Sequence, residues 1–155
     1  MLGFKSDAER PLTDEGMKEM KKIARGMEKL GLRFDRVLSS PYVRARQTAE
    51  IVAKILDMED KLQLCEFLKA EEAPQTLILA LKKMTSSENV LLVGHEPFLS
   101  GAISILLTGR TADVAIDMKK GGLCKLEVDF SNRAPVTTLK WLLTPRQLVF
   151  IGKAE

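Results

Sequence analysis

The fold of this chain is decided by the stretch Val37-Leu38-Ser39-Ser40-Pro41-Tyr42-Val43-Arg44-Ala45-Arg46-Gln47-Thr48-Ala49. Its apolar beginning predicts a strand over 34–39, and the remainder predicts a helix over 41–56, with Ser40 as N-cap and Pro41 at the first helical position. A helix that begins where a strand ends offers free N–H groups and a positive dipole end to an anion. Arg44 can add a planar, permanently charged guanidinium there, or lie in solvent as an ordinary surface arginine.

Strands and helices alternate along the rest of the chain. An amphipathic helix is predicted over 14–30, with Thr13 as N-cap and Gly31 as its stop. The other predicted elements are a weak strand over 62–65, a helix over 74–84, an apolar strand over 90–93 covered on both faces, a helix from within 94–97 to Leu107 closed by Gly109, and strands over 123–128 and 136–143. We therefore expect one domain over 1–155, a three-layer α/β/α sandwich with a mostly parallel sheet.

His95 follows the apolar strand over 90–93, as Arg44 follows the strand over 34–39. Ligands of parallel sheets bind at the carboxyl ends of the strands, so one mouth can hold both side chains. A lone loop histidine is often structural. Here its position and its near-neutral pKa favour phosphate contact or proton transfer. Glu96 is expected to cap or orient, and Arg46 to point into solvent.

Composition excludes several classes of function. A formal net charge of +3 does not indicate nucleic acid, and no apolar run is long enough for a membrane helix. Cys65 and Cys124 are isolated, which favours reduced thiols in a cytoplasmic protein. A single histidine without clustered cysteines predicts neither a metal nor another cofactor.

Four stretches together resemble the histidine phosphatase superfamily in its short, single-domain SixA-type form. They are Ser40-Pro41-x-x-Arg44-Ala45-x-Gln47-Thr48-Ala49, Arg10-Pro11-Leu12-Thr13-x-x-Gly16, Gly94-His95-Glu96-Pro97, and Lys119-Lys120-Gly121-Gly122 with the later Trp141-Leu142-Leu143-Thr144-Pro145. The resemblance implies a phosphoglycerate-mutase-like fold and phosphatase activity on phosphohistidine in proteins or on small phosphoesters. It also implies a covalent phosphohistidine intermediate and no metal.

The resemblance assigns roles to particular side chains. Arg44 and His95 become catalytic residues, and Arg10 joins them in holding the phosphate, although an ion pair of Arg10 with Glu9 or Asp7 is the plainer interpretation. Glu66 is a candidate proton donor, weakened by the neighbouring carboxylates of Glu71 and Glu72.

One part of the family pattern is missing. The chain contains no Arg-His-Gly, the motif that supplies the family's nucleophilic histidine, and His95 is its only histidine. The first predicted element is a helix, and in a parallel sheet such a helix connects two strands. The strand that should precede it is therefore missing from the predicted elements. We therefore expect a chain truncated at its N-terminus relative to the family, and inactive as written. The alternatives are a non-catalytic phosphate- or phosphoprotein-binding pseudoenzyme and, less favoured for want of room for a larger inserted subdomain, a phosphoglycerate-mutase-like transferase. The oligomeric state is not predicted.

Overall fold

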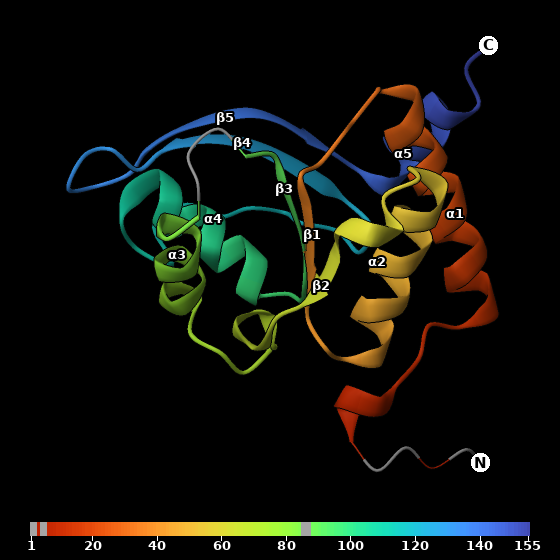
Figure 1. The fold of residues 1–155 in the computed structure, drawn as a ribbon, viewed down its shortest axis with the longest axis horizontal. Coiled ribbons are helices and arrows are strands. Elements are labelled where there is room, and N and C mark those ends of the chain that lie inside the picture. Colours follow the sequence, from red (N-terminus) through yellow and green to blue (C-terminus); the bar gives the residue numbers. More distant parts are fainter. Residues whose placement is uncertain (1–2, 4–5, 85–87) are drawn as a thin grey trace.

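Helices cover both faces of a parallel sheet in the computed structural model, which describes residues 3, 6–84 and 88–155. On one side lie α1 (Asp14–Lys29), α2 (Val43–Ile55) and α5 (Pro145–Gly152), and on the other lie α3 (Pro74–Lys82) and α4 (Phe98–Thr108) (Figure 1). The predicted α/β fold is therefore confirmed. Three short 3-10 turns complete the helical elements: η1 (Asp7–Glu9), η2 (Glu59–Lys61) and η3 (Glu66–Leu68).

The parallel sheet has the order β2-β1-β3, with β1 (Arg36–Ser39) between β2 (Leu62–Leu64) and β3 (Val90–Val93). Ser39 is paired with Leu64 on one side and with Val93 on the other, so the three strands end at one edge. The strands β4 (Leu123–Asp129) and β5 (Val136–Leu143) form a separate antiparallel pair, which has an irregular register at Lys125 and Leu126.

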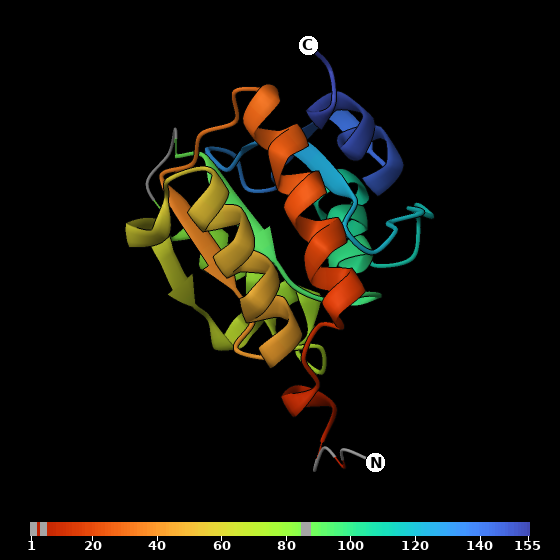
Figure 2. The same ribbon diagram turned by 90° about the vertical axis from the view of Figure 1, so that its right-hand side faces the viewer.

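The helix α1 packs across α2 and α5 to form the larger core (Figure 2). Its apolar stripe is buried against the sheet and against Leu148 of α5. Gly26 permits this crossing, because a Cβ there would lie 2.0 Å from the Leu148 carbonyl oxygen. The second core, on the opposite face, joins Leu38 of β1 to Leu77 of α3 and Phe98 of α4.

Several helix boundaries differ from the prediction. The helix α2 begins at Val43 rather than Pro41, because Tyr42 has an extended backbone (φ −60°, ψ 139°) and occupies the N-cap position. The prediction of Ser40 as N-cap is wrong, since its hydroxyl accepts the N–H of Tyr42, outside the helix, at 3.2 Å. Thr13 caps α1 as predicted, accepting the Gly16 N–H at 3.0 Å. The helix α5 was not predicted, although Thr144 and Gln147 form a capping box at its start.

The strand β3 is less covered than its apolar sequence predicts. Only Leu91 is buried, and Val90, Leu92 and Val93 are half-buried. The physical reason is the strand order: within the described residues, β3 pairs with β1 alone and β4 pairs with β5 alone. Each of these strands therefore keeps one edge free of strand partners in the described part of the chain.

Candidate functional site

The loops that follow β1 and β3 are joined at the carboxyl edge of the sheet, the lower edge in Figure 1. The N–H of Ser40 donates to the Val93 carbonyl oxygen at 2.9 Å, which extends the β1–β3 pairing by one residue. His95 comes two residues after Val93, and α2 begins three residues after Ser40. This bond brings together the two loops that carry Arg44 and His95, and we call the edge where they meet the mouth.

The guanidinium of Arg44 grips Asp7 of η1 with both of its terminal nitrogens. Nη1 donates to the Asp7 carbonyl oxygen and Nη2 to its carboxylate, each at 2.9 Å. Arg10 approaches the other carboxylate oxygen of Asp7, with its Nη1 at 3.7 Å. Arg10 and Arg44, two of the residues predicted to bind phosphate, thus both interact with the carboxylate of Asp7.

The segment that carries Asp7 and Arg10 is fixed to α2 at a second point. The N–H of Leu12 donates to Oε1 of Gln47, one turn beyond Arg44, at 2.7 Å. The turn η1 also lies against α2. The position of Asp7 beside Arg44 is therefore set by packing as well as by charge.

His95 is buried at the same mouth. Its Nε2 lies 2.8 Å from Oγ of Ser40, and its ring centroid lies 4.9 Å from that of Tyr42, with the planes inclined at 54°. Burial and the positive charge of Arg44 lower the pKa of His95 from 6.5, and the carboxylates of Asp7 and Glu71 oppose that shift. At neutral pH the imidazole is therefore uncharged.

The Asp7 carboxylate lies in a positive electrostatic environment. The hydrogen bond from Arg44 lowers the pKa of the Asp7 carboxyl against the opposing effect of desolvation, and the charges of Arg44 and Arg10 act in the same direction as the hydrogen bond. The structure thus brings Arg10 and Arg44 together at one carboxylate, and His95 lies close enough to share its electrostatics. The chemistry of this arrangement is the binding of a small, oxygen-rich anion.

The structure places Glu66 differently from the other predicted residues. Its carboxylate is exposed and forms an ion pair with Lys69. Glu71 instead accepts a hydrogen bond from the hydroxyl of Tyr42, the residue whose ring packs on His95. The assignment of Glu66 as proton donor stays a prediction, and Glu71 has the more direct connection to the mouth.

Three further residues of the site escaped the sequence reasoning: Asp7, Tyr42 and Gln47. The signal for Asp7 was its three-residue spacing from Arg10, which points to an ion pair but not to Arg44, 37 residues away. The minor predictions agree with the structure, since Glu96 accepts the Ser100 N–H at 3.0 Å and Arg46 forms an exposed ion pair with Glu50.

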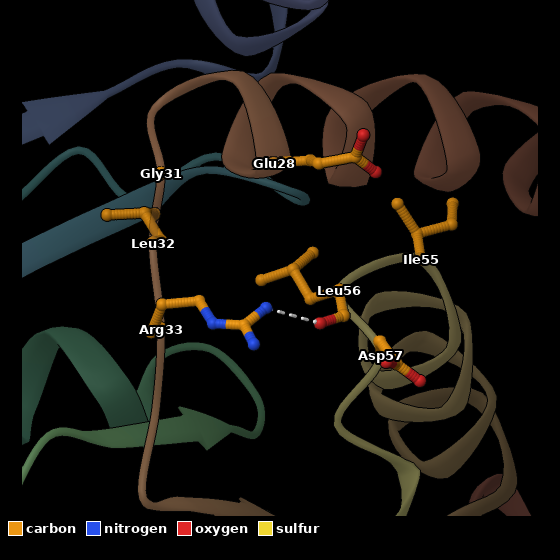
Figure 3. A pocket seen from close by; sticks show the side chains of 7 residues that line it. All are labelled: Glu28, Gly31, Leu32, Arg33, Ile55, Leu56 and Asp57. Atoms are coloured by element: carbon orange, nitrogen blue, oxygen red, sulfur yellow. Dashed lines mark hydrogen bonds between the residues drawn. The ribbon is translucent and has the colours of Figure 1, made fainter.

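A hollow elsewhere on the molecule lies between the ends of α1 and α2 (Figure 3). Its lining includes Glu28, Arg33 and Asp57, and the guanidinium of Arg33 donates to the Leu56 carbonyl oxygen at 3.0 Å. Arg33 precedes β1 and Leu56 follows α2, so this hollow is at the end of the sheet opposite to Ser40 and His95. The bond from Arg33 to Leu56 ties the segment before β1 to the end of α2.

Within the described ranges, no three or more His, Cys, Asp and Glu side chains gather as metal ligands would. The same part of the chain has no helix with the length and apolar character needed to cross a bilayer.

A parallel α/β fold with two arginines at the carboxyl ends of its strands is an arrangement that can bind an anion. Residues 3–70 match the family profile of the Histidine phosphatase superfamily (branch 1). The chain therefore has a histidine phosphatase superfamily match over these residues and is homologous to SixA along most of its length.

Two relatives cover most of the chain. Phosphohistidine phosphatase SixA of Escherichia coli is 26% identical over 149 residues, which are 95% of this chain and 89% of that protein. An uncharacterised protein of Picosynechococcus is 29% identical over 150 residues, covering 90% of each chain. A solved structure of the protein histidine phosphatase SixA complexed with tungstate superposes with a TM-score of 0.81 at 25% identity, over 96% of this chain and 92% of that one.

Proposed function

We propose that Arg10, Arg44 and His95 bind the phosphoryl group of a phosphorylated protein, as phosphohistidine, or of a small phosphoester. The observation that carries this proposal is the two-nitrogen grip of Arg44 on Asp7, with Arg10 at the second carboxylate oxygen. The two nitrogens bind two separate oxygens of Asp7, one carbonyl and one carboxylate, and a phosphoryl group presents a pair of oxygens to the same guanidinium fork. The relative complexed with tungstate supports the same chemistry, because tungstate, like phosphate, is a tetrahedral oxyanion.

We propose different roles for the two arginines and for His95, and the geometry supports them. Arg44 and Arg10 supply permanent positive charge for the equatorial oxygens of the phosphoryl group as charge redistributes. His95, uncharged at neutral pH, supplies a hydrogen bond from a buried ring. Free thiols at Cys65 and Cys124 support the expected cytoplasmic setting.

Turnover requires a nucleophile that these 155 residues lack, since His95 is the single histidine and already belongs to the anion site. We therefore propose that this chain binds phosphoryl groups without hydrolysing them. In the SixA-type reaction that the resemblance implies, a second histidine attacks phosphorus and water then hydrolyses the intermediate. The free edges of β3 and β4 are positions where a further strand carrying such a histidine can pair. The alternative is a non-catalytic phosphate- or phosphoprotein-binding pseudoenzyme, whose site no further histidine completes.

Titration with inorganic phosphate by calorimetry tests the binding proposal. Arg44→Ala removes a bidentate charge-assisted contact, typically about 1.5–3 kcal/mol, so the affinity falls roughly ten- to a hundredfold. Arg44→Lys recovers only part of it, because the fork is lost. Arg46→Ala is the matched control, since Arg46 lies on the same helix but pairs with Glu50. Equal affinities of wild type and Arg44→Ala would remove Arg44 from the site.

A turnover assay on a phosphohistidine substrate separates the enzyme from the binding module. We expect no hydrolysis by the 155-residue chain, because loss of a covalent nucleophile commonly costs on the order of 10⁴–10⁶ in rate. Hydrolysis at a rate near that of SixA, lost in His95→Asn, would contradict this expectation and require a mechanism that uses His95 alone.

A further inference from the structure

We infer that Ser40 is a positioning residue for His95: its hydroxyl donates a hydrogen bond to Nε2 and so leaves Nδ1–H as the group that meets a phosphoryl oxygen. The contact with phosphate rests on the proposed function. The tautomer of His95 follows from the geometry alone and is tested independently.

Ser40 is held rigidly on its backbone and on its side chain. It has no exposed surface, its N–H is bonded to the Val93 carbonyl oxygen at 2.9 Å, and its Oγ accepts the N–H of Tyr42 at 3.2 Å. Three neighbouring segments, namely β1, β3 and the start of α2, therefore fix the place of one hydroxyl oxygen. That oxygen lies 2.8 Å from Nε2 of His95.

Counting protons decides the direction of this bond. The hydroxyl of Ser40 has one hydrogen, and its oxygen already accepts from Tyr42. A buried O–H group requires an acceptor, and Nε2 is the one that the described part of the chain provides. Nε2 accepts only when its lone pair is free, so the ring proton of the neutral imidazole is on Nδ1.

The reverse arrangement is disfavoured by the same count. If Nε2–H donated to Ser40, the hydroxyl would accept twice and its own hydrogen would be buried without a partner. Burial and the charge of Arg44 also hold the imidazole in its neutral form, and the lowered pKa of His95 agrees with this. With Nε2 engaged by Ser40, Nδ1 is the remaining ring nitrogen that can bind a ligand.

The inference predicts what His95 contributes to the site. A neutral ring with a fixed Nδ1–H is a hydrogen-bond donor of constant direction near neutral pH. It is not a proton source. Without Ser40 the ring populates both tautomers, and the fraction with its proton on Nε2 presents a lone pair to an anionic oxygen. That fraction weakens phosphate binding.

Ser39 offers a matched control. It is adjacent, equally buried and also bears a hydroxyl, but that hydroxyl donates to the Ser40 carbonyl oxygen at 2.9 Å. Ser39→Ala therefore removes a buried hydroxyl from the same strand end without removing the partner of Nε2.

Because His95 is the only histidine, histidine labelled with ¹⁵N gives the NMR signals of a single imidazole. At pH 8, we expect long-range ¹H–¹⁵N spectra of the wild type to show Nδ1 protonated and Nε2 bare. In Ser40→Ala the proton is shared between the two nitrogens, and the affinity for inorganic phosphate falls about two- to tenfold. Ser40→Thr restores both, and Ser39→Ala matches the wild type.

A wild-type spectrum with the proton on Nε2 overturns the inference without any variant, which protects the test if Ser40→Ala does not fold. A folded Ser40→Ala with the wild-type tautomer, or with an altered tautomer and unchanged phosphate affinity, also overturns the positioning role. Failure of the proposed function has a different signature, since phosphate affinity would then be insensitive to Arg44→Ala whatever the tautomer of His95.

Discussion

Removing the Asp7 side chain should strengthen phosphate binding, because its carboxylate occupies Nη2 of Arg44, a donor that the phosphoryl group needs. Both partners of this ion pair reach solvent, with 32% of the Arg44 side chain and 57% of the Asp7 side chain exposed. A pair of this kind is typically formed about 1.4 to 5 times as often as it is broken. Phosphate binds only those molecules in which the Arg44–Asp7 ion pair is broken. If the pair is formed R times as often as it is broken, these molecules are a fraction 1/(1 + R) of the total. Asp7→Ala should therefore raise the phosphate affinity about two- to sixfold.

The assay is calorimetric titration with phosphate at low salt and at roughly 0.5 M salt, where screening reduces the difference between the two proteins. Asp60→Ala is the control, because it removes an equivalent exposed carboxylate that pairs with Lys61 in η2. An unchanged affinity in Asp7→Ala would refute the competition. A weaker affinity would mean instead that Asp7 orients the Arg44 guanidinium for the ligand.

The remaining predictions concern His95 and the α1–α5 crossing. His95→Asn should lower the phosphate affinity about fivefold or more and abolish most of the phosphate-dependent rise in melting temperature, while the ligand-free melting temperature changes little. A large ligand-free drop with an unchanged phosphate shift would assign His95 a structural role instead. Since the pKa of His95 is lowered from 6.5 in the folded state, the unfolded state binds more protons between the two values. The stability contributed by neutral His95 is therefore complete above about pH 6.5 and is lost as the pH falls through the lowered pKa. Urea denaturation at several pH values measures this dependence, which should be absent in His95→Asn. Gly26→Ala should destabilise the fold by about 2 kcal/mol or more, because its Cβ would meet the Leu148 carbonyl oxygen. Gly31→Ala is the comparison, because a Cβ there meets open space and the cost comes only from the backbone strain at φ 69°.

The fold could be predicted from the sequence because its signals are local and agree with one another. The stripe of α1, the cap at Thr13 and the apolar run of β3 each specify one element, and strand–helix alternation then specifies a parallel sheet. The start of α2 was misplaced because a Ser-Pro pair is a general helix-start signal. It does not reveal that Tyr42 takes an extended backbone to reach Ser40 and His95. The helix α5 was missed because Thr144 and Pro145 were interpreted as the end of a strand.

The candidate site was predictable for the residues that a strand end positions. Arg44 and His95 each follow a strand of the same parallel sheet, so their proximity follows from topology. Asp7, Tyr42 and Glu71 were not predictable in this way. Their contacts depend on where two irregular segments, one before α1 and one before α3, fold back over the sheet edge. The spacing of apolar residues does not indicate where an irregular segment folds back over the sheet. The charges of Asp7 and Glu71 alone are compatible with many partners.

The anion site and the free strand edges are separate features of this molecule, and that separation bears on function. Arg44, Asp7 and Ser40 are held by η1, α2 and the bond between Ser40 and Val93, none of which uses the open edges of β3 and β4. In the proposed function these residues bind the phosphoryl group, whereas the attack on phosphorus needs a second histidine, and the sequence has one, His95. A strand that pairs at the edge of β3 would place its own carboxyl end beside His95, because parallel strands of this sheet end together. On the proposed function, hydrolysis differs from binding in one requirement, a second histidine placed at such a strand end beside the anion site.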